Sequence, residues 1–203
     1  MLVRAKKPMT YPIEITTYLT ENPIQPCTRY SDGRRNSQDN EDRIVNALLE
    51  RYGSEIVEVP PSRHWWDIKL FQQPYQIKSS EMTRPDNLSS KLALVYALTN
   101  RNPDDFKDSW QYFYDALINH KEDLGRDYFY IVHDKRDGTV HLQSIRTLAR
   151  LKPNGSNLPF QIKWEDNLIP VERTFDENYE FLISVFKESV RKRLIVHNDY
   201  EHL

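Results

Sequence analysis

The chain has 203 residues, a length typical of one domain, and its 38% hydrophobic and 29% charged residues are the balance of a globular protein. No apolar run is long enough for a membrane span, no secretory signal is expected, and the single cysteine, Cys27, excludes an intramolecular disulfide framework and a cysteine-rich zinc site. We therefore expect a cytoplasmic protein without a membrane partner, and the net charge of −2 implies that any nucleic acid is bound by local basic patches.

The first part of the chain is predicted to be irregular and then helical. Residues 1–38 contain four prolines and include a polar, basic stretch over 29–36 that is typical of a loop. A helix is predicted over 40–52, because apolar residues recur on one face at helical spacing. Three strands are expected next, at 55–59, 65–71 and 75–79. Residues 72–74 are expected to form the turn between the second and the third strand.

The rest of the chain alternates helices with strands. The predicted elements are helices over 88–99 and 104–119, strands at 128–133 and 139–142 that form a hairpin, a loop over 152–159, a short strand, and a helix over 177–194. Pro85-Asp86-Asn87 is expected to open the first of these helices. The order of the elements predicts an α/β (α+β) fold, a mixed β-sheet flanked by helices, in a single domain that spans residues 1–203.

One hairpin of the predicted sheet carries side chains suited to phosphate chemistry. Side chains alternate between the faces of a strand, so Gln76 and Lys78 share one face of the third strand, and pairing with the second strand brings Asp67 to the same side. Asp67, the side-chain oxygen of Gln76 and the backbone carbonyl of Ile77 are hard oxygen ligands of the kind that Mg²⁺ takes. A bound ion can acidify a water, and Lys78 can orient that water or stabilise charge on a phosphate.

The spacing of these residues resembles a known signature. Asp67, eight further residues, and then Gln76-Ile77-Lys78 are similar to the motif of the PD-(D/E)XK nuclease superfamily, with glutamine in the place of an acid and Trp66 in the place of proline. The resemblance covers about residues 40–134, and size and composition resemble type II restriction endonucleases. It implies a restriction-endonuclease-like αβββαβ core and Mg²⁺-dependent cleavage, with Mn²⁺ as a substitute, of double-stranded DNA at a short specific sequence.

The same resemblance implies further site residues and partners. Family members often add a glutamate from the first core helix, and Glu41 in the first turn of the helix at 40–52 is the expected one, with Glu81 as the alternative. The position of Glu41 equally suits a charge that stabilises a helix N-terminus. Type II restriction enzymes usually act as homodimers on palindromic sites, so a homodimer is expected. A companion DNA methyltransferase that acts on the same site is expected as well.

DNA contacts are expected from local basic and amide side chains outside the hairpin. Arginine and asparagine can recognise base edges in the major groove, whereas lysine mostly meets phosphates. The expected contacts are Arg29, Arg34, Arg35, His64, Arg84, Lys152, Asn154, Asn157 and Lys163. Residues 1–38 and 144–203 are accordingly expected to serve DNA recognition and dimerisation. A second Gln-Ile-Lys, at 161–163, is interpreted as a coincidence or as a strand that leads away from a recognition loop.

Three other interpretations remain open at the level of sequence. Asp67 and Lys78 also fit a surface hairpin whose polar residues alternate with buried ones. A repair or junction-resolving nuclease would use the same core but recognise the shape of DNA. A non-catalytic DNA-binding or assembly protein with a decayed nuclease core is the third, which Gln76 favours and the pair of Asp67 and Lys78 opposes.

Overall fold

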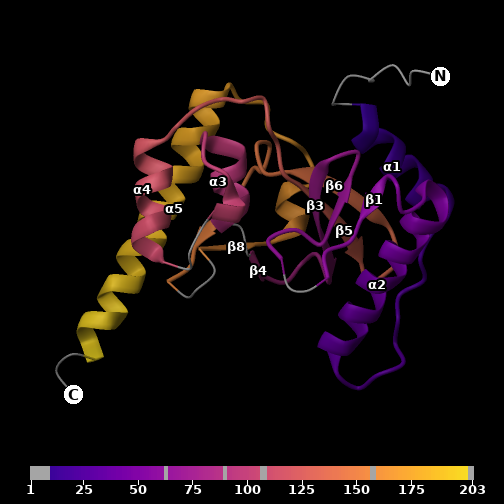
Figure 1. The fold of residues 1–203 in the computed structure, drawn as a ribbon. Coiled ribbons are helices and arrows are strands. Elements are labelled where there is room, and N and C mark those ends of the chain that lie inside the picture. The colour runs from indigo at the N-terminus through magenta and orange to yellow at the C-terminus, as the bar shows by residue number, and fades with distance from the viewer. Residues whose placement is uncertain (1–9, 62–63, 89–90, 106–108, 156–158, 201–203) are drawn as a thin grey trace, which may run out of the picture.

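The computed structural model describes residues 10–61, 64–88, 91–105, 109–155 and 159–200, and the side chains in these ranges except at 10, 11, 110 and 195–200. Its centre is a five-stranded mixed sheet with helices on both faces (Figure 1). The strands, in spatial order, are β1 (Val57–Glu58), β2 (Ile68–Leu70), β3 (Gln73–Ser80), β5 (Phe129–Asp134) and β6 (Val140–Ser144). The predicted fold class, a mixed sheet flanked by helices, is confirmed.

Strand β3 organises the sheet. It pairs antiparallel with β2, with Ile68 opposite Tyr75, and parallel with β5 over six residues, from Tyr75 opposite Phe129 to Ser80 opposite Asp134. The pairs β1–β2 and β5–β6 are antiparallel. Parallel neighbours need a long crossover connection, which the segment from 81 to 128 provides. Both hairpins predicted from the sequence are therefore present.

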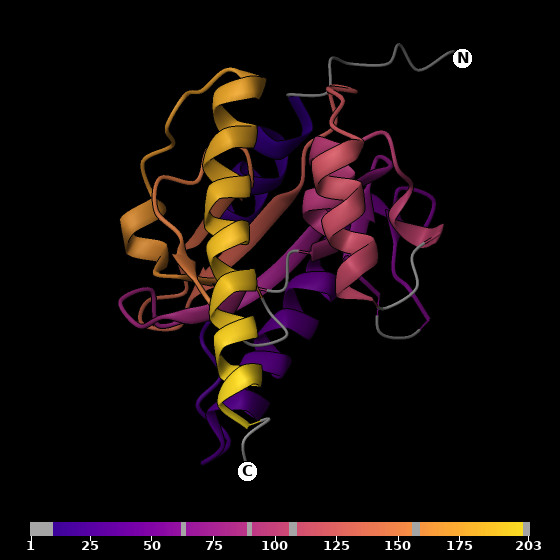
Figure 2. The ribbon, with the colours of Figure 1, turned by 90° about the vertical axis from the view of Figure 1, so that its left-hand side faces the viewer.

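Helices cover the two faces of the sheet unequally. On one face lie α1 (Thr10–Glu21) and α2 (Gly33–Tyr52), whose apolar residues join the inward side chains of β2, β3 and β5 in one core. On the other face, α3 (Lys91–Leu98), α4 (Trp110–Asn119) and α5 (Phe175–Tyr200) enclose a larger core. Figure 2 shows α5 in front of the sheet with α1 and α2 behind it. No described helix combines the length and hydropathy needed to cross a bilayer.

A second, three-stranded sheet lies beside the larger core. Its strands, in the order β4 (Asp86–Leu88), β8 (Phe160–Ile162) and β7 (Lys152–Pro153), are all antiparallel. Two short 3₁₀ helices, η1 (Pro103–Asp105) and η2 (Trp164–Asn167), complete the structure. The expectation that Pro85-Asp86-Asn87 opens a helix is wrong. Residues 86–88 pair with β8, which buries Leu88 in the core.

The N-terminal region is more helical than the sequence suggested. Helix α1 lies within 1–38, where an irregular chain was expected, and Pro12 is tolerated because it lies in the first turn, where a backbone N–H has no helical acceptor. Helix α2 begins at Gly33, so residues 33–36 are not part of a loop. Asp32 caps α2, since its side chain accepts a hydrogen bond from the backbone N–H of Arg34 at 2.9 Å.

Other boundaries differ by a few residues. Helix α4 begins at Trp110 and not at 104, because 103–105 form η1, whereas residues 106–108 lie outside the described part of the chain. The C-terminal helix extends over Phe175–Tyr200, beyond both predicted ends. Strands β1 and β2 are shorter than predicted. Strand β2 begins only at Ile68, so Asp67 lies just before it, and this position creates the site described next.

Candidate active site

The site lies where β2 and β3 separate. The backbone N–H of Asp67 donates to the carbonyl of Tyr75 at 2.9 Å, and the Asp67 carboxylate then accepts the backbone N–H of Ile77 through Oδ2 at 2.7 Å. A strand that continued alongside β3 would offer a backbone carbonyl at this place. Asp67 thus holds the open edge of β3 with its side chain, and the carbonyl of Ile77 points to the same edge as its N–H because of strand geometry.

Gln76 and Lys78 lie on the face of β3 opposite to Tyr75 and Ile77. Gln76 is only 9% exposed, and no described group donates a hydrogen bond to its buried Oε1. Extending the Ile68–Tyr75 register by one residue places Asp67 opposite Gln76. A buried amide oxygen without a hydrogen-bond donor costs free energy of folding. Gln76 therefore indicates a place where a cation or a hydrogen-bond donor could bind to this oxygen.

Helix α2 contributes a second carboxylate to the same edge. Oε1 of Glu41 accepts the backbone N–H of Ser79 at 3.3 Å, two residues along β3 from the N–H that Asp67 holds. Burial raises the pKa of Glu41 to about 7; positive Lys78 opposes this shift and negative Asp67 adds to it. Burial also raises the pKa of Asp67, against the effects of the Ile77 N–H and of Lys78. The positive charge of Lys78 thus opposes the rise in pKa of both carboxyl groups.

Glu41 is not at a helix N-terminus. Because α2 begins at Gly33, Glu41 lies in the interior of the helix, on the side that faces β3. The expectation of a favourable charge in the first helical turn is therefore wrong. Glu81, the alternative glutamate, follows β3 and forms an ion pair with Arg84 at 2.9 Å.

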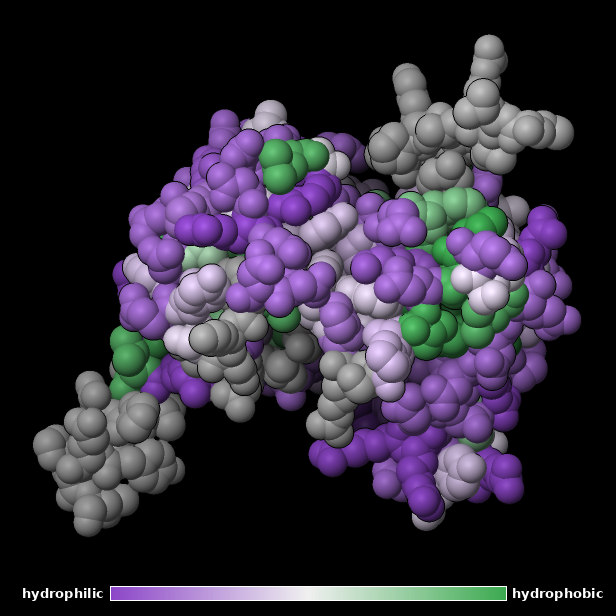
Figure 3. Space-filling model, viewed as in Figure 1, coloured by the Kyte–Doolittle hydropathy of each residue, from purple (hydrophilic) through white to green (hydrophobic). Residues whose placement is uncertain are grey.

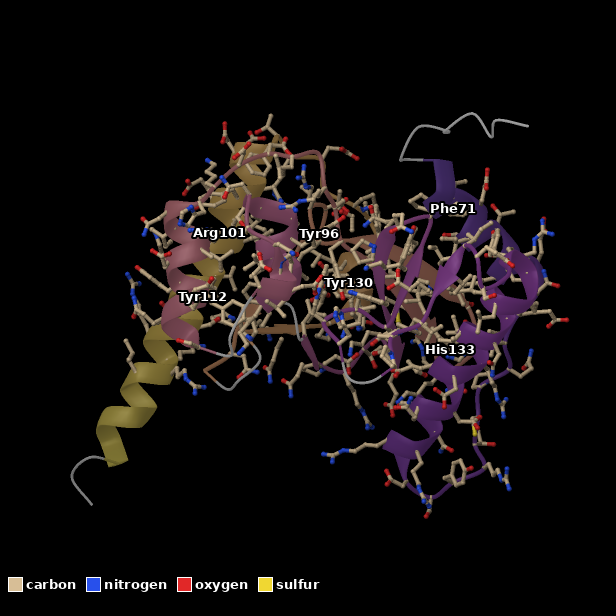
Figure 4. All side chains as sticks on the ribbon, in the orientation of Figure 1. Phe71, Tyr96, Arg101, Tyr112, Tyr130 and His133 are labelled. Atoms are coloured by element: carbon tan, nitrogen blue, oxygen red, sulfur yellow. The ribbon has the colours of Figure 1, made fainter. Side chains whose placement is uncertain are left out.

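A buried polar network supports this edge from behind. Asn40 is fully buried; its Nδ2 donates to Oγ of Ser79 at 2.9 Å, and its Oδ1 accepts the N–H of Cys27 at 2.7 Å. His133, also fully buried, contacts the same Ser79 hydroxyl through Nδ1 at 3.3 Å and the carbonyl of Ile24 through Nε2 at 2.8 Å. His133 lies on the α2 side of the sheet (Figure 4). These residues were not predicted from the sequence, because their contacts join segments that are remote in the chain.

A cavity of about 420 Å³ gives access to the carboxylates. Its lining includes Glu41, Asp67, Ile77, His64 and Trp66. His64 contacts the ring of Trp66 in a tilted arrangement, with 4.5 Å between ring centroids, and its Nε2 lies 3.4 Å from a carboxylate oxygen of Asp104. Of the expected DNA contacts, His64 is thus the one that borders the carboxylates directly.

The donor set fits a hard divalent cation. No cluster of three or more His, Cys, Asp and Glu side chains is present in the described residues, so a metal would have to draw on other oxygens as well. Asp67 and Glu41 supply two carboxylates, and the unpartnered oxygen of Gln76 and the carbonyl of Ile77 are neutral donors. Mg²⁺ is commonly held by one or two carboxylates with waters in its remaining positions.

The expected DNA contacts are distributed over two regions. Arg29 and Arg35 both lie over the ring of Tyr30, at 5.6 and 5.5 Å, and Arg34 shares the exposed first turn of α2. The remaining residues lie at or near the small sheet: exposed Arg84, Lys152 on β7, Asn154, which donates to Asn87, and Lys163, which pairs with Glu165. Asn157 lies outside the described residues.

The beginning of α2 and the end of α5 project downward in Figure 1, on either side of β4 and β8. Hydrophilic residues cover the projection that α2 forms (Figure 3). Arg191, Lys192 and Arg193 lie on the α5 side.

Comparison with known proteins adds no relative: no family model matches the chain, and neither a curated protein nor a solved structure matches it. The function must therefore be argued from the geometry of the site.

Proposed function

We propose that this protein is a Mg²⁺-dependent nuclease that hydrolyses phosphodiester bonds of double-stranded DNA. One observation carries the proposal: the carboxylates of Asp67 and Glu41 accept the backbone N–H groups of Ile77 and Ser79 at the open edge of β3 and line one accessible cavity. Two carboxylates at such an edge, with Lys78 on the same strand, are groups that metal-assisted phosphodiester hydrolysis can use.

Each side chain has a separate task in this proposal. Asp67 and Glu41, with the oxygens of Gln76 and Ile77, hold the ion, which when bound acidifies a water and neutralises charge on the scissile phosphate. Lys78 orients the attacking water and stabilises the additional negative charge of the transition state. Glu41, whose pKa lies at about 7, exchanges a proton readily near neutral pH and must lose it before it can bind the ion.

The order of the strands supports a restriction-endonuclease-like core. Helix α2 is followed by the antiparallel strands β1, β2 and β3, then by helices, and then by β5, parallel to β3. This is the αβββαβ order that the resemblance to PD-(D/E)XK nucleases implies. By that resemblance we further propose a type II restriction endonuclease, a homodimer that cuts at a short specific sequence beside a companion methyltransferase.

The first test is a digestion of unmethylated plasmid and phage DNA with Mg²⁺, with Mn²⁺ and with EDTA. Discrete bands that need the metal, and that Asp67→Asn abolishes, would support a site-specific endonuclease. Smears, or preferential cutting of branched DNA, would replace it with a structure-guided nuclease of the same core. DNA that is bound in Ca²⁺ but stays intact with Mg²⁺ and Mn²⁺ would overturn the catalytic proposal and leave a DNA-binding protein.

A further inference from the structure

A row of polar side chains crosses the outer face of the small sheet. Asn87 on β4 is paired with Gln161 on β8, and Gln161 is paired with Lys152 on β7. Residues paired across antiparallel strands project to the same face with about 5 Å between their Cβ atoms. Asn87 and Lys152 are exposed and Gln161 is partly exposed, so the row faces solvent.

The opposite face of the sheet fixes this row in place. Leu88, Phe160 and Ile162 are at most 1% exposed and belong to the larger core. Asp86 is held from the same side, because its Oδ2 accepts the indole N–H of Trp164 at 2.9 Å. The polar row therefore stands on a rigid support and not on a loop.

The two carboxamides are oriented by a shared hydrogen-bond acceptor. Oδ1 of Asn87 accepts from Nε2 of Gln161 at 3.2 Å and from Nδ2 of Asn154 at 3.1 Å. No hydrogen bond within the described residues uses Nδ2 of Asn87 or Oε1 of Gln161. A donor and an acceptor on two paired residues thus remain on the outer face of the sheet.

The surroundings of the row suit a DNA duplex. Lys152, Lys163 and Gln161 line a surface hollow of about 450 Å³. Lys192 of α5 donates to the carbonyl of Pro153 at 3.4 Å, which places a further cation beside β7. Strand β4 follows the catalytic strand β3 after only residues 81–85, and Figure 1 shows β4 and β8 between the projections of α2 and α5.

We propose that Asn87 and Gln161 recognise an adenine in the major groove. Adenine presents there an N7 acceptor beside an N6 donor, which is the complement of the Asn87 donor and the Gln161 acceptor. The major groove is wide enough for a pair of β-strands, and Lys152 at the end of the row is placed for an adjacent phosphate. This inference rests on the proposed nuclease function and assigns the second Gln-Ile-Lys sequence, at 161–163, to base recognition.

The test is to measure cleavage specificity on a pool of duplexes with randomised sequence. Asn87→Ala and Gln161→Ala should lower the preference for adenine at one position by about 5- to 150-fold while cleavage of the pool as a whole continues. Gln111→Ala, which removes an exposed carboxamide on α4, is the matched control and should leave the preference unchanged. Duplexes with 7-deazaadenine at that position lack the N7 acceptor. The wild-type protein should cut them more slowly than duplexes with adenine, whereas Asn87→Ala should cut both at the same rate.

The outcomes separate this inference from the function on which it rests. If the wild-type protein cuts at a specific sequence and both variants keep its preference at every position, the adenine contact alone is overturned. A wild-type protein that neither cuts nor binds duplex DNA overturns the nuclease proposal and the adenine contact together. The 7-deazaadenine comparison uses the wild-type protein, so it decides the matter even if a variant fails to fold.

Discussion

The carboxylate of Asp67 takes the place of a backbone carbonyl of the sheet. It accepts the N–H of Ile77 at 2.7 Å, beside the part of β3 that β2 does not cover. One side chain thus satisfies the edge of the strand and lines the cavity that Glu41 also lines. Fold and proposed chemistry therefore meet in a single residue, and substitutions at Asp67 have to be designed to separate the two.

Asp67→Asn should abolish cleavage and leave the fold intact. Asparagine keeps an oxygen that can accept the Ile77 N–H but lacks the charge that holds a metal. Loss of several kcal/mol of transition-state stabilisation corresponds to roughly a thousandfold lower rate. Asp67→Ala should in addition lower the free energy of unfolding by about 1–3 kcal/mol, because the N–H of Ile77 loses its acceptor. Initial cleavage rates and urea denaturation would measure the two effects, and cleavage retained by both variants would remove Asp67 from the site.

Glu41→Gln should stabilise the metal-free protein at alkaline pH. Glu41 has a pKa of about 7 in the folded protein against an ordinary value of 4.5, so the folded state binds its proton more tightly. Its contribution to stability is complete below the unfolded pKa and is lost as the pH rises through about 7. Partial exposure to solvent reduces the cost at high pH to on the order of 2 kcal/mol.

The measurement is denaturant unfolding in EDTA between about pH 5 and pH 8. The wild-type protein should lose stability over this range relative to Glu41→Gln, and Mg²⁺ should restore more of the loss in the wild type because the ionised carboxylate binds it. Parallel pH profiles of the two proteins in EDTA would contradict the raised pKa of Glu41.

The local pattern of the hairpin was sufficient to predict the centre of the site. Alternation along β3 and a short turn place Asp67, Gln76 and Lys78 near one edge before any coordinates are known. The extent of α2 was missed because Gly33, Asn36 and Ser37 are weak helix formers, although Asp32 directly before Gly33 is a capping signal. That error misplaced Glu41 along its helix.

Other features could not be inferred from one sequence. The Asn40–Ser79 and Ser79–His133 contacts join residues 39 and 54 positions apart, and Asn87 meets Gln161 across 74 positions. Strand β4 has only three residues and follows a proline, so its local sequence favours the start of a helix. Pairing with β8 and burial of Leu88 override that preference.

Gln76→Glu should strengthen metal binding and lower the Tm of the metal-free protein. A third carboxylate beside Asp67 and Glu41 increases repulsion in a buried site, and a divalent cation relieves it. The increase in Tm on addition of Mg²⁺ should therefore be larger in this variant than in the wild type. Gln76→Leu is the control that removes the oxygen, and its Tm should respond least. An equal response of all three proteins would exclude Gln76 from the metal site.

Asn40→Ala should destabilise the fold and displace Glu41. It leaves the N–H of Cys27 without its acceptor and the Ser79 hydroxyl without its donor, at roughly 1–3 kcal/mol for each buried group. Urea denaturation would measure the loss, with Asn46→Ala, at an exposed position of the same helix, as a control that should change little. Cleavage by Asn40→Ala under native conditions should also fall, since Ser79 positions Glu41.

Arg34→Ala and Arg35→Ala should weaken DNA binding in a way that depends on salt. Both residues are exposed in the first turn of α2, at the projection that this helix forms, and contacts to phosphates release counterions. Each lost phosphate contact lowers the slope of log K against log salt concentration by about one. Titration of a duplex in Ca²⁺ at several salt concentrations would give the slopes. Arg51→Ala, at the opposite end of α2, should keep the wild-type slope. If its slope falls as much as those of Arg34→Ala and Arg35→Ala, α2 attracts DNA only through its overall charge.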